Sequence, residues 1–292
     1  FVPIFGYERS ALYPDGHRNV LFATRAASRV TPFFMRDSGK SPEMEKWKGA
    51  MAGAQSFGLP RPDEGDEPGS GTGALAINDT KLLYEDIRGR RGLAISHTSG
   101  TLMGTDWRDN DPVLEPVVEI FQGCRTSYEQ VGAPHVADAV KDKEHIQRTG
   151  YFPAGLVRNA WAKGYKLGII TSSDHGSTHL SYAMVYAESA TREGILDAIR
   201  RRHTYGATDN IVLEVRMGSH FMGDEFPLAK AIPLEVKARG TNAISKIEVI
   251  KDGQVVFANE PARKDLQFAF KDTGEIAGRH YYYVRLLQTD GM

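Results

Sequence analysis

Short apolar runs alternate with amphipathic segments over the first two-thirds of the chain. The apolar runs are bounded by turn-forming residues, which is typical of buried strands. They occupy residues 2–9, 20–23, 93–95, 117–121 and 167–170. Apolar side chains recur at helical spacing in residues 79–90, 154–163 and 191–202. Strands that alternate with helices predict an α/β fold with a mainly parallel sheet.

The pattern changes near Asp209, where apolar and polar residues begin to alternate with a period of two. The alternating runs occupy residues 211–217, 234–238, 247–250, 255–257, 266–270 and 281–287. This period is typical of antiparallel strands with one buried face. Asp252 and Gly253 predict a tight hairpin turn between two of these runs. We therefore expect an α/β domain over residues 1–208 and a small antiparallel β-sandwich over residues 209–292.

Composition narrows the classes of protein that need to be considered. The 292 residues carry a formal net charge of -1, which argues against nucleic acid or an acidic membrane surface as a partner. No apolar run approaches the roughly 20 residues of a membrane-spanning helix. The single cysteine, Cys124, excludes an intrachain disulfide, and we interpret it as a small buried side chain rather than a metal ligand. Residues 59–73, rich in proline, glycine and acidic residues, predict a surface loop.

Potential metal ligands stand next to several of the predicted strands. Acidic and histidine side chains in such places have ordinary roles as salt-bridge partners, turn residues or helix caps. Their recurrence at the ends of strands favours a shared metal site instead. Carboxylates and neutral imidazoles suit zinc, manganese or iron. The candidates are Glu8, His17, His97, Asp174, His175 and His179.

Six motifs that occur in order along the chain carry a resemblance to a known family. They read GYE, GHRNV, SHTSGT, DWRDNDP, EIFQG and SSDHGSTH. The chain resembles the PHP (polymerase and histidinol phosphatase) superfamily, and within it a bacterial branch related to carbamate-ester hydrolases. The resemblance implies a metal-dependent hydrolase on a distorted β/α barrel, here incomplete. It also implies two or three divalent transition metal ions, which are zinc, manganese or iron.

The resemblance assigns roles to the candidate ligands. Glu8 corresponds to the acidic residue that bridges two metal ions, and His17, His97 and Asp174 correspond to further ligands. The last motif departs from the superfamily pattern, because Gly176 stands where a second histidine is expected. His175 or His179 then has to replace it. We favour His175, which adjoins Asp174, although adjacent residues of an extended chain point in opposite directions.

The superfamily begins with a His-x-His strand, and this sequence contains no His-x-His. We therefore expect the sequence to be a fragment that lacks the first strands of the barrel, and expect its carboxyl end to be truncated as well. The resemblance points to a bacterial protein, and either the cytoplasm or the periplasm is compatible with it.

We expect hydrolysis of a small phosphoester or a carboxyl or carbamate ester by a metal-activated water. Glu8, His97 and Asp174 are the expected catalytic residues. Arg108 and Asn110 follow the His97 strand and are candidates for orienting an anionic substrate, and a hydrogen-bond network that stabilises their loop is an equal alternative. A different class of function is a degenerate barrel with a sandwich that binds polysaccharide or a protein partner.

Overall fold

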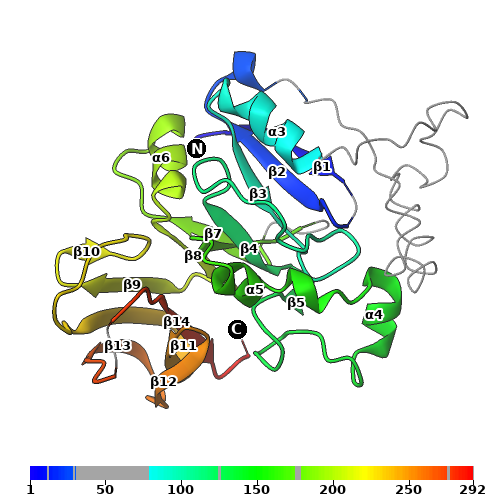
Figure 1. The fold of residues 1–292 in the computed structure, drawn as a ribbon. Coiled ribbons are helices and arrows are strands. Elements are labelled where there is room, and N and C mark those ends of the chain that lie inside the picture. Colours follow the sequence, from blue (N-terminus) through cyan, green and yellow to red (C-terminus); the bar gives the residue numbers. More distant parts are fainter. Residues whose placement is uncertain are drawn as a thin grey trace, which may run out of the picture.

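The computed structural model describes residues 1–11, 13–28, 30, 79–123, 126–174, 179–274 and 277–291. The predicted loop at residues 59–73, Cys124 and His175 lie outside the described residues. The described residues form a mixed α/β fold that consists mostly of strands (Figure 1). Their strands form two six-stranded sheets and one two-stranded sheet. None of the helices in this part of the chain is long and apolar enough to cross a membrane.

The first sheet carries all of the candidate ligands that lie on strands. Its strands are β1 (Phe5–Ser10), β2 (His17–Phe22), β3 (Leu93–Ser96), β4 (Val117–Gln122), β5 (Thr126–Ser127) and β6 (Gly168–Ser172). The order is β1-β2-β3-β4-β5, and β6 also pairs with β4. The pairings of β4 with β3 and with β6 are parallel, as predicted. β2 is antiparallel to both β1 and β3. The pairing with β1 is antiparallel because the short connection after β1 returns the chain directly.

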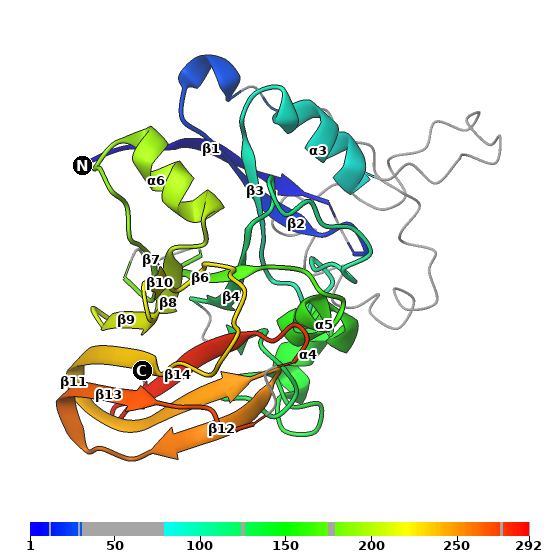
Figure 2. The same cartoon turned by 60° about the vertical axis from the view of Figure 1, so that its left-hand side comes forward.

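Helices cover both faces of this sheet. α3 (Asp79–Arg88) packs Leu83 and Ile87 against one face, in a cluster with Val20 and Ala94. α6 (Arg192–Arg200) packs Leu196 and Ile199 against the other face, in a cluster with Ile95 and Ile170. Adjacent residues of a strand point to opposite faces, so Ala94 and Ile95 belong to different clusters. Figures 1 and 2 show the sheet between these two helices.

The remaining helical elements of the described residues are short. They are η1 (Arg25–Ala27), α4 (Lys143–Thr149), η3 (Pro153–Gly155) and α5 (Val157–Ala162). The helix predicted at residues 154–163 is therefore a 3-10 turn followed by α5, in which Leu156, Val157, Ala160 and Trp161 are buried. Thr191 caps α6, because its Oγ1 accepts a hydrogen bond from the Gly194 backbone nitrogen at 3.0 Å.

The second sheet is antiparallel and is organised around one long strand. Its members are β9 (Val212–Met217), β10 (His220–Phe221), β11 (Leu234–Lys251), β12 (Gln254–Asn259), β13 (Arg263–Phe270) and β14 (Tyr282–Gln288). β11 joins two runs that the sequence predicts as separate strands. Its first half pairs with β9 and β13, and its second half pairs with β12 and β14. The predicted hairpin after β11 is confirmed, with positive φ angles of 51° at Asp252 and 79° at Gly253.

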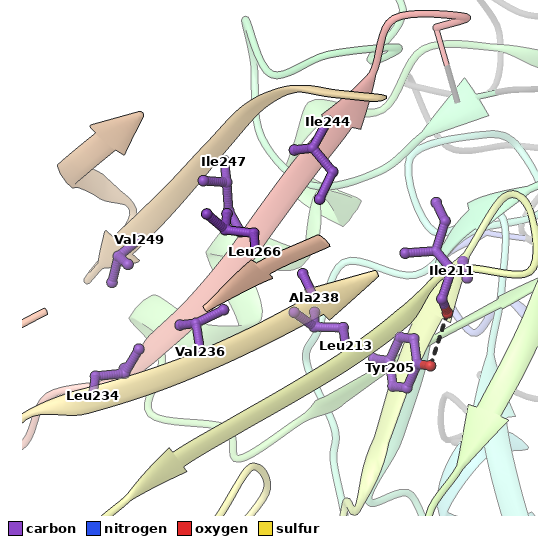
Figure 3. Close-up of a cluster of buried hydrophobic side chains, with 11 residues drawn as sticks. Tyr205, Ile211, Leu213, Leu234, Val236, Ala238, Ile244, Ile247, Val249 and Leu266 are labelled. Carbon is purple, nitrogen blue, oxygen red and sulfur yellow. Dashed lines mark hydrogen bonds between the residues drawn. The ribbon is translucent and has the colours of Figure 1, made fainter. Parts of the chain in front are cut away.

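The buried side chains of both halves of β11 meet in one hydrophobic cluster (Figure 3). Val236 and Ala238 come from the first half, and Ile247 and Val249 from the second. The two-stranded sheet of β7 (Tyr182–Val185) and β8 (Thr204–Ala207) adds Tyr205, whose hydroxyl donates to the Ile211 carbonyl at 2.9 Å. This cluster therefore crosses the expected boundary between residues 208 and 209, and that division stays a prediction.

The expected barrel is not closed in the part of the chain that the structure describes. β1 pairs only with β2 there, and β6 pairs only with β4, so no pairing joins the two sides of the sheet. The coarser expectation of an α/β fold is confirmed.

Candidate metal centre

Three potential metal ligands from neighbouring strands meet at one edge of the first sheet. Glu8 lies near the end of β1, His17 begins β2, and His97 directly follows β3. Because β2 runs antiparallel to both neighbours, its first residue lies at the edge where β1 and β3 end. One ligand atom from each residue lies within 4.8 Å of the other two. We call Glu8, His17 and His97 the triad.

The geometry of the triad suits a shared cation. Glu8 Oε1 is hydrogen-bonded to His17 Nδ1 at 2.8 Å and lies 3.8 Å from His97 Nε2. Ligands of a tetrahedral zinc ion lie about 3.3 Å apart when each bond is about 2.0 Å, so Glu8 Oε1 and His97 Nε2 lie close to this spacing. His17 is 3% exposed, and its Nε2 is buried with no hydrogen-bond partner among the described residues. Burial keeps water from hydrogen-bonding to this nitrogen, and a bound metal ion would take the place of that missing partner.

Glu8 supplies negative charge to the triad. The hydrogen bond from His17 lowers the pKa of the Glu8 carboxyl group to about 2, and the charges of His97 and His17 add to this effect against the opposing effect of burial. Glu8 is therefore an anion at neutral pH. Its side chain is 38% exposed, so the triad is open to solvent on the Glu8 side.

A buried network on the opposite face of the sheet holds the strands that carry both histidines. Arg18 follows His17, Ser96 precedes His97, and Arg18 and Ser96 are paired across β2 and β3. Glu115 is fully buried and accepts a hydrogen bond from Arg18 Nε at 3.3 Å. It also accepts hydrogen bonds from the hydroxyls of Ser96 and Tyr84. Burial acts to lower the pKa of Arg18, but attraction to Glu115 raises it overall, so Arg18 stays charged.

The backbone bends sharply where the chain leaves β3 and β6. Thr98 has a φ of 49° and Asp174 a φ of 55°, both in the left-handed region. This conformation is strained for a β-branched residue such as Thr98. The His97 backbone nitrogen donates to the His17 carbonyl at 3.4 Å, which ties the two histidine-bearing segments together next to the bend. Strain of this kind is concentrated at functional sites in proteins.

The other predicted ligands lie beyond the end of β6. Asp174 and His179 are exposed, and the His179 ring lies 6.4 Å from the Tyr182 ring. In the described part of the chain, the triad is the group whose ligand atoms lie within 4.8 Å of one another. Asp174 and His179 therefore stay predictions as ligands, and His175 lies outside the described residues.

Arg108 and Asn110 make contacts within their own loop. Arg108 Nε donates to Asp106 Oδ1 at 2.9 Å, and Asn110 Nδ2 donates to the Glu115 carbonyl at 3.1 Å. These contacts agree with the alternative of a loop-stabilising network. The Arg108 side chain is 42% exposed, and its role in substrate binding stays a prediction.

Two buried glutamates near the triad are not among the candidate residues that the sequence predicts. Glu115 is 0% exposed and Glu119, on β4, is 1% exposed. Both interrupt the mostly apolar stretch of residues 113–121. An acidic residue inside a buried apolar run is the signal that marks them, because burial of a carboxylate without a partner is costly.

Comparison with known proteins finds distant relatives in chlamydiae. The chain is 23% identical over 243 residues to an uncharacterized protein of Chlamydia muridarum, which covers 72% of this chain and 38% of the relative. An uncharacterized protein of Chlamydia trachomatis gives the same values. One from Chlamydia pneumoniae is 25% identical over 227 residues, which covers 67% of this chain and 36% of the relative. This chain therefore spans less than half the length of these relatives. No family profile matches it, and neither does any solved structure.

Proposed function

We propose that the chain is a metal-dependent hydrolase that cleaves an ester-type bond. The observation that carries the proposal is the triad, whose buried His17 nitrogen has no hydrogen-bond partner among the described residues. One carboxylate and two imidazoles form the ligand set of catalytic zinc in several hydrolases, in which water or substrate takes the fourth position. Structural metal sites instead use four protein ligands.

The proposed chemistry assigns a task to each residue of the triad. Glu8 brings the negative charge that offsets the charge of a divalent cation, and His17 and His97 bring neutral nitrogen donors. The buried network around Glu115 holds both histidines in place before any ligand arrives, as efficient catalysis requires. A bound zinc, manganese or iron ion would supply Lewis acidity toward a carbonyl or phosphoryl oxygen.

The PHP-like motifs extend the proposal beyond the triad. Asp174, with His175 or His179, is the proposed ligand group for an adjacent ion, and the first sheet is proposed to be part of a distorted barrel of PHP type. The exposed side of Glu8 gives a small ester or phosphoester a path to the centre.

Hydrolysis of chromogenic esters tests this proposal. Probes are bis(p-nitrophenyl) phosphate, p-nitrophenyl acetate and an aryl N-methylcarbamate, each assayed with zinc or manganese and after chelation. We expect metal-dependent hydrolysis of at least one probe and its loss in Glu8→Ala. His280→Ala is the matched control, because His280 also contacts a carboxylate, Asp252, at 2.6 Å, but its second nitrogen lies 2.9 Å from the Ala277 carbonyl oxygen. Equal hydrolysis with and without metal would overturn the proposal.

A further inference from the structure

Glu119 shares the sheet face of the triad. Val118 of β4 pairs with Ser96 of β3, and the two strands are parallel. Glu119 directly follows Val118, and His97 directly follows Ser96. Because side chains alternate along a strand, the next residues, Glu119 and His97, lie on the same face. Val118 belongs to a hydrophobic cluster on the opposite face, in agreement with this assignment.

On its other side, Glu119 lies next to the strand that leads to Asp174. It pairs with Ile170 of β6, and a hydrogen bond from Ser172 lowers the pKa of its carboxyl group. The charges of Asp174 and Glu8 both raise that pKa. The carboxyl group of Glu119 therefore interacts electrostatically with Asp174 and with Glu8 of the triad.

Glu119 differs from the other buried glutamates of the described residues. Glu115 pairs with Arg18, and Glu129 and Glu248 both pair with Arg285. Glu119 Oε1 is buried and has no hydrogen-bond partner among the described residues. Burial is the largest influence on its pKa, which it raises to about 8. The other three buried glutamates of the described residues are paired with arginine, whereas Glu119 is retained beside the triad at a cost in stability.

We propose that Glu119 binds the attacking water of the hydrolase through Oε1 and takes up its proton. This inference rests on the proposed function. One O–H bond of the water breaks and its proton passes to Oε1, while the water oxygen forms a bond to the carbonyl carbon or the phosphorus of the substrate. The bond from that atom to the leaving oxygen breaks, and the proton on Glu119 passes to the leaving oxygen. Glu119 is thereby returned to its starting state.

The surroundings of Glu119 suit this task. A general base needs a lone pair that is available to the attacking water, and Glu119 Oε1 has no hydrogen-bond partner among the described residues. The charged groups that act on Glu119 are Glu8 on β1 and Asp174 after β6, and the Ser96–Val118 pairing places His97 beside it. The negative charges of Glu8 and Asp174 raise the pKa of Glu119, and a bound cation would offset them. We therefore expect the pKa of Glu119 to be lower in the metal-bound protein than in the metal-free protein.

The test compares Glu119→Gln, which keeps the shape of the side chain, with Glu129→Gln as a buried control outside the centre. Each is assayed for zinc content, kcat and the pH profile of hydrolysis. We expect Glu119→Gln to keep its zinc, to lose at least about 100-fold in kcat, and to lose the rise of kcat with pH. The rise should remain in Glu129→Gln. Retention of kcat within about threefold by Glu119→Gln would overturn the inference.

Two further measurements separate a proton acceptor from a merely structural residue. Ser172→Ala removes the hydrogen bond that lowers the pKa of Glu119, so the rise in kcat should move to higher pH. In the metal-free protein at pH 6, infrared spectroscopy should show the carbonyl band of a protonated carboxyl group that is missing in Glu119→Gln. Identical spectra would contradict the inference even if kcat falls. Absence of metal-dependent hydrolysis in the unsubstituted protein would instead refute the proposed function on which the inference rests.

Discussion

Substitution of Glu119 by glutamine should change how the stability of the metal-free protein depends on pH. Burial raises the pKa of Glu119 from 4.5 to about 8 in the folded chain, whereas the unfolded chain keeps the ordinary value. As pH rises from 4.5 to 8, the unfolded chain loses this proton and the folded chain retains it. The free energy of unfolding therefore falls across this window, by at most about 5 kcal/mol at 1.36 kcal/mol for each pKa unit.

Glutamine has nearly the same shape and no charge, so Glu119→Gln should lack this fall. We expect the two proteins to have similar stability near pH 5, and the variant to be several kcal/mol more stable at pH 8. Urea unfolding with a chelator present, at half-unit steps from pH 5 to pH 8, measures the difference. Glu8 does not interfere, because its pKa of about 2 confines its effect to pH below 4.5. Parallel pH dependences of the two proteins would show that burial does not raise the pKa of Glu119.

Two further substitutions test how the centre and its covering helix are held. Glu115→Gln leaves the guanidinium of Arg18 buried without its ion-pair partner, so urea unfolding at pH 7 should show a loss of about 3–5 kcal/mol. A loss below 1 kcal/mol would show that the network does not hold β2 and β3 together. Thr191→Ala removes the cap of α6 and should cost about 1 kcal/mol in the same assay. An unchanged unfolding midpoint would contradict the role of Thr191 as a cap.

The sequence predicts the helices well because their signals are local. The apolar spacing and the cap of α6 both lie within residues 191–202, and the structure has the helix at Arg192–Arg200. The hairpin at Asp252 and Gly253 is predicted for the same reason, because two adjacent residues decide the turn.

Strand direction and strand length are predicted less well because they depend on distant residues. β2 reads as one more member of a parallel sheet, but its pairing partners make it antiparallel to both neighbours. β11 reads as two strands because residues 239–246 are mostly polar and do not alternate regularly. β9 and β13 pair with β11 up to Arg239, and β12, β13 and β14 pair with it from Ile244 onward, so the strand is held on both sides of this stretch.

The centre itself was predicted in part. Glu8, His17 and His97 stand out in the sequence because each lies beside an apolar run, and the structure brings them together. Glu119 interrupts an apolar run in the same way as Glu115, and what distinguishes it depends on the residues that lie beside it on β3 and β6. The missing arginine partner, which distinguishes it from Glu115, becomes visible only in the folded chain.

Calorimetric titration of the metal-free protein with zinc measures whether the triad binds a metal ion. We expect the unsubstituted protein and His280→Ala to bind zinc with the same affinity. His17→Ala should bind it at least about 100-fold more weakly, because loss of a ligand costs at least as much as loss of a residue that supports one. Equal zinc affinity in His17→Ala and His280→Ala would contradict the assignment of the triad as a metal centre.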